Sequence, residues 1–264
     1  MDQELINQAE GALLDLNGVF YVDETLAPGA REAVAALRAA NLPRLYLTNT
    51  TTRNLDSLYR MLRDLGLPAE KSEILSPPQA AVLYLRTLGK PRCHLLLREE
   101  LKKDFAEFPV SHVNPDVVVI GDIGDRWNHA IMNQAFQMVM YGAKLVALHK
   151  GRFWQVDNEL RLDIGAYVAG LEYAAGHEAI IIGKPSPDFF RMALQSLGTS
   201  AEKTVMFGDD IEMDVGGAQR VGMKGVLVKT GKYRPEQEVL SSVRPDGFLD
   251  SIGDLPRLLE GRGR

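Results

Sequence analysis

The sequence predicts an α/β fold with a doubly wound parallel sheet. Short apolar runs bounded by turn residues alternate with longer stretches of helical periodicity along the 264 residues. The runs are apolar throughout rather than alternating, which is typical of strands in a parallel sheet that is covered on both faces. There are also more such runs than one small sheet needs, and this indicates two domains.

The elements follow each other in a regular order. We expect strands at residues 12–16, 44–49, 93–97, 116–121, 144–149, 179–183, 204–209 and 225–230. Between them, apolar residues spaced three and four apart predict helices at residues 30–40, 54–66, 129–142, 188–198 and 214–222.

The strands divide into two sets. The runs beginning at residues 12, 44, 179, 204 and 225 are predicted to form a Rossmann-like core sheet, and those at 93, 116 and 144 a smaller α/β unit inserted into it. Ser76-Pro77-Pro78 has the composition of a linker. We therefore predict a core domain of residues 1–76 and 181–264 and an inserted α/β domain of residues 77–180.

Composition limits the classes of function. A net charge of −5 and a sequence pI of about 5.6 argue against a general nucleic-acid or anionic-membrane surface. The polar, acidic N-terminus is unlike a signal peptide, and no apolar run approaches the roughly 18 residues of a membrane span. Cys93 is the lone cysteine, which fits a reducing compartment. We expect a cytoplasmic protein that binds neither nucleic acid nor membrane.

Polar residues gather where the predicted core strands end. In open α/β sheets the site lies beyond the carboxyl ends of the strands, and the topology brings these ends to one rim. The candidate site residues are Asp15, Asn17, Thr48, Asn49, Lys184, Asp209, Asp210 and Asp214.

The chemistry that fits this set is phosphoryl transfer through an aspartate. A carboxylate such as Asp15 can attack phosphorus and form an aspartyl-phosphate. It must approach a dianion, and Asp15 and Asp209 offer the oxygen ligands that Mg²⁺ prefers. Thr48 can donate a hydrogen bond to the phosphoryl group, and Lys184 can neutralise its charge. Each residue alone also has an ordinary structural reading as a helix cap, turn residue or solvated lysine, so the hypothesis rests on their convergence.

The motifs resemble those of the haloacid dehalogenase superfamily of aspartate-nucleophile phosphatases. They are LLDLNGV, YLTNTT, the lysine of IIGKP, and MFGDDIEMDVGGAQ, and they occur in the family's order. The inserted domain is similar to the α/β cap (C2-type) of subfamily IIA. Other sequence segments, such as VLVKTGKYR, most resemble a branch of the family that holds phospholysine, phosphohistidine and pyrophosphate phosphatases. Relatives of this kind suggest a homodimer formed through the cap.

The resemblance implies a role for each residue. Asp15 is the nucleophile and a Mg²⁺ ligand, Asp209 is a further ligand, and Asn17 offers the metal its main-chain carbonyl. Thr48 and Asn49 bind the phosphoryl group, and Lys184 bridges nucleophile and phosphate. Asp210 and Asp214 support the site.

Asn17 departs from the pattern, because many relatives have an aspartate there that acts as general acid and base. An amide cannot carry a proton at neutral pH. The loss of this general acid should slow the hydrolysis of alkyl phosphates most, because their leaving groups need a proton, and that of P–N or pyrophosphate-type bonds least. We therefore predict a Mg²⁺-dependent phosphatase of small phosphorylated substrates or phosphoamino acids that favours good leaving groups.

Two alternatives stay open at this point. The chain can be a phosphoryl-binding or interaction module with little turnover, or a small-metabolite phosphatase disabled by an aspartate-to-asparagine substitution at position 17. In the cap, residues 149–154 are candidates to face the substrate, with Arg152 meeting an anionic group and Trp154 stacking. Packing within the cap is the competing interpretation of these residues.

Overall fold

The computed structural model describes residues 3–22, 25–156 and 159–260, with the side chains of residues 3 and 154–160 excepted. The chain divides into two compact units. The first comprises residues 1–48, 56–75 and 184–264, and the second comprises residues 49–55 and 76–183. Residues 49–55, 76 and 181–183, which we expected in the first domain, thus belong to the second unit.

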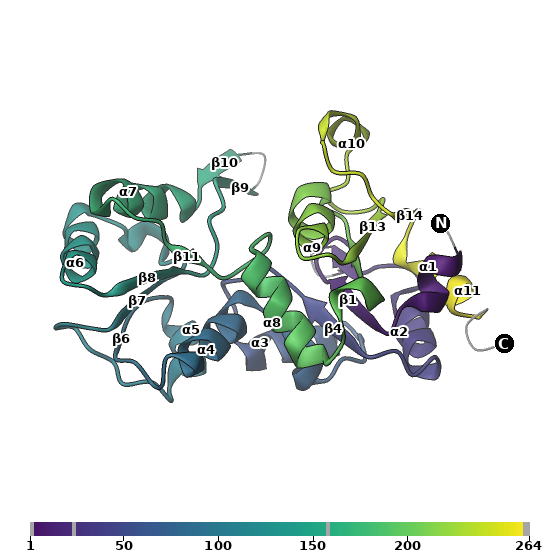
Figure 1. Ribbon diagram of the computed structural model, residues 1–264, viewed down its shortest axis with the longest axis horizontal. Coiled ribbons are helices and arrows are strands. Elements are labelled where there is room, and N and C mark those ends of the chain that lie inside the picture. The colour runs from purple at the N-terminus through teal and green to yellow at the C-terminus, as the bar shows by residue number, and fades with distance from the viewer. Residues whose placement is uncertain (1–2, 23–24, 157–158, 261–264) are drawn as a thin grey trace. The chain divides into compact units, whose positions relative to one another are not determined.

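The first unit is built on a fully parallel sheet (Figure 1). The strand order is β14-β13-β12-β1-β4-β5, and each neighbouring pair is parallel. The strands are β1 (Gly11–Asp15), β4 (Arg44–Leu47), β5 (Ile74–Leu75), β12 (Thr204–Gly208), β13 (Lys224–Val228) and β14 (Gly247–Leu249). The five residues of β1 and of β12 are all buried, as their unbroken apolar sequences predict.

Helices connect these strands and cover the sheet. They are α1 (Gln3–Gln8), α2 (Ala30–Ala39), α3 (Leu55–Asp64), α8 (Pro187–Leu197), α9 (Gly217–Gln219), α10 (Pro235–Leu240) and α11 (Leu255–Leu259). Shorter elements are the hairpin β2 (Tyr21–Val22) and β3 (Thr25–Leu26), the 3₁₀ turns η1 (Lys71–Glu73), η4 (Ala201–Lys203) and η6 (Ile252–Asp254), and the π-helical turn η5 (Ile211–Gly216). The core between the layers includes Phe20, Tyr46, Phe189, Phe190 and Phe207, all fully buried.

The helix predicted at residues 214–222 has a different form. The chain enters η5 at Ile211, three residues earlier than expected, and only Gly217–Gln219 is α-helical. The reason is a cap: the Asp210 carboxylate accepts hydrogen bonds from the N–H groups of Glu212 and Met213, at 3.1 and 3.0 Å. An aspartate at this position satisfies donors that a helix start leaves unpaired.

The second unit has a parallel sheet of its own. Its order is β11-β8-β7-β6, with strands β6 (Cys93–Leu96), β7 (Val117–Ile120), β8 (Lys144–Ala147) and β11 (Ile180–Ile181). A separate hairpin is formed by β9 (Phe153–Val156) and β10 (Glu159–Leu162). The helical elements are α4 (Pro77–Thr87), α5 (Glu99–Lys102), η2 (Lys103–Phe105), η3 (Gly124–Arg126), α6 (His129–Met140) and α7 (Gly165–Ala175).

One strand lies in the other sheet from the one we expected. The run at residues 179–183 was assigned to the core sheet, but Ile180 pairs with Val146 and Ile181 with Ala147, at the edge of the second sheet. That assignment was wrong because an apolar run specifies a buried strand and not the sheet in which it pairs. The first sheet gains β5 and β14 instead, two strands too short to stand out in the sequence.

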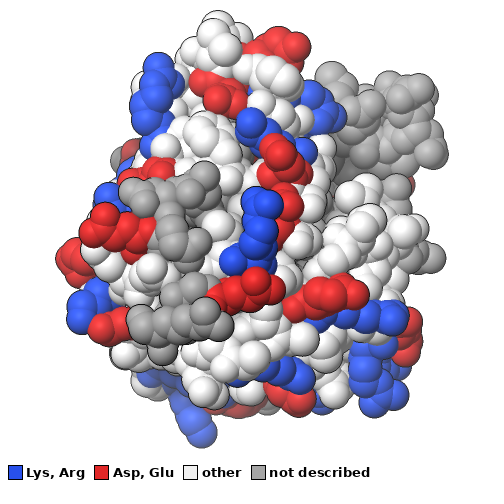
Figure 2. Space-filling view, turned by 90° about the vertical axis from the view of Figure 1, so that its right-hand side faces the viewer, with Lys and Arg blue, Asp and Glu red and all other residues white. Residues whose placement is uncertain are grey.

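The surface carries both signs of charge. On the face shown in Figure 2, lysine and arginine side chains are interspersed with aspartate and glutamate side chains, and neither sign forms an extended patch. Among the residues described here, no helix is both long enough and apolar enough to span a bilayer.

Candidate active site

The site lies where the strand order of the first sheet reverses. β1 lies between β4 and β12, so the chain leaves β1 toward one side of the sheet and later fills the other side. Such a switch point opens a crevice beyond the carboxyl ends of the strands. Asp15 is the last residue of β1, and Asp209 follows directly after β12, so the topology places both carboxylates at this switch point.

Lys184 joins two of the carboxylates. Its Nζ donates to Asp15 Oδ1 at 2.5 Å and to Asp214 Oδ1 at 2.6 Å. The three residues are separated by up to 199 positions in the chain, yet at most 5% of each is exposed. Burying these charges is tolerable because each one has a charged hydrogen-bond partner.

Asp209 is held by main-chain groups. Its Oδ2 accepts a hydrogen bond from the Lys232 N–H at 2.6 Å. Gly18 and Gly231 flank it with φ of 94° and 54°, and a Cβ on either glycine would lie 1.9 or 2.0 Å from Oδ2. The Thr230 hydroxyl donates to the Gly18 carbonyl at 2.5 Å and ties the two loops together. Only glycine permits this approach, because of both its left-handed backbone and its missing side chain.

Asp210 and Asp214 order the turn after β12. The second oxygen of Asp214, Oδ2, accepts from the Asp210 N–H at 3.1 Å, while the Asp210 carboxylate caps η5. The two acids are four residues apart, a spacing at which like charges repel. Lys184 relieves that repulsion, because its ammonium contacts Asp214 directly.

The carboxylates are suited to a divalent cation. One oxygen each from Asp15, Asp209 and Asp214 lies within 4.8 Å of the others, and all three residues are buried. An all-oxygen set of this kind matches the preference of hard cations such as Mg²⁺. One lysine contacts two of the three acids, so negative charge exceeds positive charge within this group. The residues therefore fit a bound metal ion.

The pKa values reflect this excess of buried negative charge. Burial raises the pKa of Asp15 to about 6, although the nearby Lys184 opposes the shift. Burial raises the pKa of Asp209 to about 6, with a contribution from the charge of Asp214, and that of Asp214 to about 7, again against Lys184. Burial alone would lower the pKa of Lys184, but Asp15 and Asp214 outweigh it and raise the value. Lys184 is therefore the charged partner.

The remaining predicted residues lie at the same strand ends or just beyond them. Asn17 is exposed, two residues after Asp15. Thr48 is 2% exposed, directly follows β4, and its N–H donates to the Leu75 carbonyl at 3.2 Å. The structure thus brings Asp15, Lys184, Asp209, Asp210 and Asp214 into one connected cluster in the first unit. Asn49, which is partly buried, is the first residue of the second unit's segment.

Sequence reasoning missed the two loops that hold Asp209. Gly18, Thr230, Gly231 and Lys232 were not among the candidate residues, although the Thr-Gly-Lys turn follows a predicted core strand at the same rim. They were overlooked because Lys232 acts through its main-chain N–H and Gly18 and Gly231 act through the absence of a side chain, while Thr230 alone of the four contributes a side-chain group.

The cap segment gives a mixed result. His149 follows β8, and its Nε2 lies 3.3 Å from Thr51 Oγ1 within the second unit. Arg152 is exposed. The stacking role predicted for Trp154 falls on a side chain outside the described residues.

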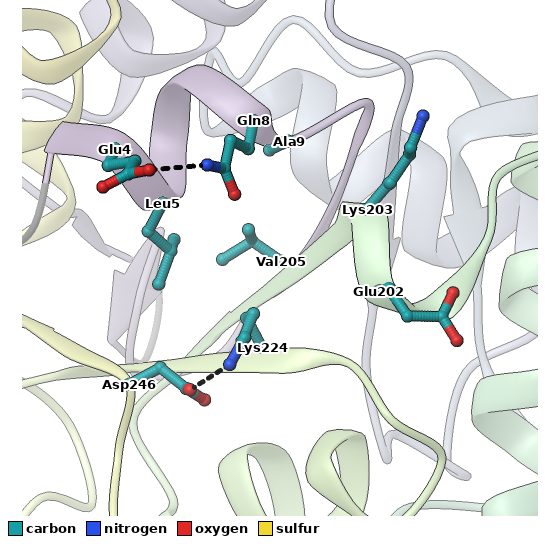
Figure 3. Close-up of a pocket in the computed structure, with 9 residues that line it drawn as sticks. All are labelled: Glu4, Leu5, Gln8, Ala9, Glu202, Lys203, Val205, Lys224 and Asp246. Atoms are coloured by element: carbon teal, nitrogen blue, oxygen red, sulfur yellow. Dashed lines mark hydrogen bonds and ion pairs between the residues drawn. The ribbon is translucent and has the colours of Figure 1, made fainter.

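A cavity lies at the opposite ends of the core strands. It has a volume of about 270 Å³ between α1 and the starts of β12 and β13 (Figure 3). Lys224 pairs with Asp246 at 3.0 Å, and Lys203 pairs with Glu10 at 2.6 Å. The cavity is thus at the amino ends of strands whose carboxyl ends carry the aspartates, and its lysines are already neutralised by acidic partners.

Comparison with known proteins agrees with this geometry. Residues 12–110 match the haloacid dehalogenase-like hydrolase family, and residues 181–255 match a second, HAD-hydrolase-like family. The chain is 40% identical over 262 residues to the phospholysine phosphohistidine inorganic pyrophosphate phosphatase of Rattus norvegicus, covering 97% of this chain and 96% of the relative. It is 39% identical over 240 residues to the haloacid dehalogenase-like hydrolase domain-containing protein 2 of Bos taurus, covering 91% of each.

A solved structure extends the likeness to the whole fold. The 4-nitrophenylphosphatase of Thermotoga maritima matches with a TM-score of 0.88 at 26% identity, covering 96% of this chain and 98% of that one. The buried aspartate–lysine cluster, the parallel sheets and these matches lead to one conclusion. The chain belongs to the haloacid dehalogenase-like hydrolase family and is an enzyme.

Proposed function

We propose that the protein is a Mg²⁺-dependent phosphatase that forms an aspartyl-phosphate on Asp15. The observation that carries the proposal is the pair of contacts from Lys184 to Asp15 and Asp214, with Asp209 alongside, in a buried cluster at the switch point. The printed names of the rat and Thermotoga proteins, both phosphatases, support it. We also propose that the second unit is a substrate-selecting cap. The cytoplasmic location stays a prediction.

Each residue of the cluster has a chemical task in this proposal. The Asp15 carboxylate attacks phosphorus, and the Lys184 ammonium fixes its Oδ1 at 2.5 Å and offsets the charge of the incoming phosphoryl group. Asp15, Asp209 and the Asn17 main-chain carbonyl would hold Mg²⁺, which supplies the positive charge that allows a carboxylate to approach an anion. Asp214 keeps Lys184 charged and in place. Thr48 and Asn49 are proposed to bind the phosphoryl oxygens.

The reaction balances without a proton from the enzyme when the leaving group is good. With a singly protonated pyrophosphate, Asp15 forms a bond to one phosphorus, the bridging P–O bond breaks, and hydrogen phosphate leaves with the electron pair. Water then attacks the aspartyl-phosphate, releases phosphate and restores the Asp15 carboxylate. An alkyl phosphate would leave as an alkoxide, which needs a proton that the Asn17 amide cannot give.

The substrate class follows from this requirement, because hydrogen phosphate leaves without a proton from the enzyme and a nitrogen leaving group can depart with a proton that the substrate already carries. We propose P–N and pyrophosphate-type bonds, in small phosphorylated molecules or phosphoamino acids, as the preferred substrates. The printed name of the rat relative mentions both kinds of bond. The exposed amide of Asn17 also favours the second candidate, a phosphoryl-binding module with little turnover. Retention of Asp15, Lys184 and Asp209 in one buried cluster weighs against that candidate, because binding alone needs no nucleophile.

Phosphate release should depend strongly on the leaving group. In the presence of Mg²⁺ we expect pyrophosphate, imidodiphosphate and phosphoimidazole to be hydrolysed about 10² to 10⁴ times more efficiently than a simple alkyl phosphate, the range lost with a general acid. Asn17→Asp should raise the alkyl phosphate rate and narrow that ratio. Initial rates of phosphate release measure both.

Asp15→Asn is the blank for these assays. Similar rates on alkyl phosphate and imidodiphosphate would contradict the leaving-group argument. Absence of turnover on every substrate, with inorganic phosphate still bound, would favour the binding module. Turnover that appears only in Asn17→Asp would identify position 17 as the site of a lost activity.

Metal binding should be pH-dependent. The pKa values of Asp15 and Asp209, about 6, and of Asp214, about 7, lie above the ordinary 3.8. Without metal, the folded state therefore binds protons at a higher pH than the unfolded state does. The contribution of these groups to the free energy of unfolding consequently rises as pH falls from about 8 toward 5. Mg²⁺ needs the ionised carboxylates, so its stabilisation should be largest at pH 8 and should fade below pH 6.

Melting temperatures measured with Mg²⁺ and with a chelator between pH 5 and 8 test this. At a Mg²⁺ concentration of 100 times Kd the stabilisation should reach about 2.7 kcal/mol. Asp209→Asn is the matched variant, and in it the Mg²⁺ effect should largely disappear. A Mg²⁺ effect that is equal at pH 5 and pH 8 would show that these carboxylates do not hold the ion.

We further propose a homodimer formed through the second unit. α6 and α7 contact each other, and both connect parallel strands, so they run in the same direction. Large apolar side chains are exposed on or directly after these helices: Met140 by 56%, Tyr141 by 83% and Tyr173 by 93%. Such side chains are costly to leave in water when they are clustered.

A charge at this position should disrupt the dimer. Tyr173→Glu is expected to shift the sedimentation velocity of the protein from dimer to monomer, because a carboxylate would be buried without a partner in the interface. Val239→Glu is the control, because Val239 is 79% exposed but belongs to the first unit. A monomeric wild-type protein, or a dimer unaffected by Tyr173→Glu, would contradict this assignment.

A further inference from the structure

The segment 49–55 leaves one unit to join the other. It lies between Thr48 and Asp56, which both belong to the first unit, yet its own contacts place it in the second. Its first residue is Asn49, the proposed ligand of the phosphoryl group. Whatever orders this segment therefore helps to place Asn49, and the contacts described below come from the second unit.

The carboxyl end of the segment is anchored by hydrogen bonds. Asn54, which is 5% exposed, donates through Nδ2 to the Glu100 carbonyl at 3.2 Å. The Leu55 N–H donates to the Asp104 carboxylate, at 3.2 Å to Oδ2. These bonds hold the end that leads into α3, five residues away from Asn49.

The amino end is anchored by His149. Its Nε2 lies 3.3 Å from Thr51 Oγ1, and both side chains are largely buried. The Gly151 N–H donates to His149 Nδ1 at 3.1 Å, so Nδ1 must be the unprotonated nitrogen of the ring. In the neutral ring the proton is then on Nε2, which donates to the Thr51 hydroxyl. The backbone thus fixes the tautomer that this contact needs.

Burial favours the neutral form of the His149 ring. Burial lowers the pKa of His149, while the charges of Asp163 and Asp122 oppose the shift. The Asp163 Oδ2 lies 3.7 Å from Nδ1, beyond hydrogen-bond distance, and the other oxygen of that carboxylate accepts from the Ile164 N–H at 2.7 Å. Nδ1 therefore stays an acceptor for Gly151, and Nε2 stays a donor.

Asn49 lies against the same end of the second sheet. A Cβ on Gly183 would be 2.9 Å from Asn49 Oδ1 and 2.7 Å from the Leu148 carbonyl. Leu148 directly precedes His149, and the Gly183 N–H donates to the Leu148 carbonyl at 2.8 Å. Asn49 and Thr51 are thus both in contact with the chain that follows β8 and β11, and their positions are set together.

We propose that His149 is a positioning residue for Asn49: through Thr51 it orders the start of segment 49–55, so that Asn49 is held ready to bind the phosphoryl group. The inference rests on the proposed function of Asn49. It adds a residue of the second unit that acts on phosphoryl binding without touching the substrate. Its loss should weaken the binding of phosphate and leave the aspartate–lysine cluster of the first unit intact.

Paired variants separate the hydrogen bond from the packing. Thr51→Val removes the hydroxyl and keeps the shape, whereas Thr51→Ser keeps the hydroxyl. His149→Asn keeps an acceptor for Gly151 but is too short to reach Thr51, whereas His149→Gln restores a donor near the position of Nε2. We expect Thr51→Val and His149→Asn to raise KM by about three- to tenfold, the value of one hydrogen bond, with a smaller change in kcat.

The double variant and the metal supply the remaining controls. In the double variant Thr51→Val with His149→Asn, KM should rise no further than in the more impaired of the two single variants, because both substitutions remove the same contact. Thr51→Ser and His149→Gln should keep KM near that of the wild type, and the affinity for Mg²⁺ should be unchanged in all of them. If His149→Asn does not fold, the contrast between Thr51→Val and Thr51→Ser decides alone.

Three results would overturn the proposal: an unchanged KM in Thr51→Val, multiplicative effects in the double variant, or equal losses in Thr51→Ser and Thr51→Val. The failure of the proposed function is distinct, because the wild type would then release no phosphate. In that case calorimetry with inorganic phosphate and Mg²⁺ still decides the positioning role. Thr51→Val must weaken that binding, and Thr51→Ser must not.

Discussion

The structure of the site depends on one charge balance: the Lys184 ammonium between the carboxylates of Asp15 and Asp214. Three buried acids cannot all stay ionised without compensation, and a single lysine compensates only partly, which is why burial raises the pKa of each acid. A buried charge group of this kind is weak evidence for stability, since desolvation offsets the attraction. It is stronger evidence for chemistry, because the remaining negative charge suits a cation and the fixed lysine suits an incoming phosphoryl group.

The rest of the first unit positions four side chains, those of Asp15, Lys184, Asp209 and Asp214. β1 and β12 are buried along their full length, so the acids at their ends are fixed by the hydrogen bonding of the sheet. The loops beyond the strands pack so closely that glycine is required at positions 18 and 231, where a Cβ would collide with the Asp209 carboxylate. The Lys232 N–H then completes the orientation of Asp209. Rigid strands and tight loops together give a preorganised site, which is what electrostatic catalysis requires.

Much of this was predictable from the sequence, and what was not has a physical reason. Asp15, Thr48 and Asp209 follow apolar runs, and parallel strands necessarily bring their carboxyl ends to one rim. Lys184 was also found, although the strand before it pairs in the second sheet, because apolarity does not encode the pairing partner. The two loops that carry Gly18 and Gly231-Lys232 were missed, since main-chain donors and absent side chains leave little trace in a sequence. The sequence did not show that residues 49–55 belong to the second unit, because this depends on contacts with residues about 50 to 100 positions away, such as Glu100 and His149.

The central claim is that Asp15 becomes covalently phosphorylated, and trapping that intermediate tests it most directly. The enzyme would be mixed with Mg²⁺ and imidodiphosphate, quenched in acid and digested at low pH with pepsin, and the peptide that contains Asp15 examined by mass spectrometry. Because Asn17 cannot act as a base for the second step, the intermediate should accumulate. The account predicts one added phosphoryl group on Asp15, absent in Asp15→Asn. A wild-type enzyme that releases phosphate while this peptide stays unmodified, or that carries the phosphoryl group on another residue, would contradict it.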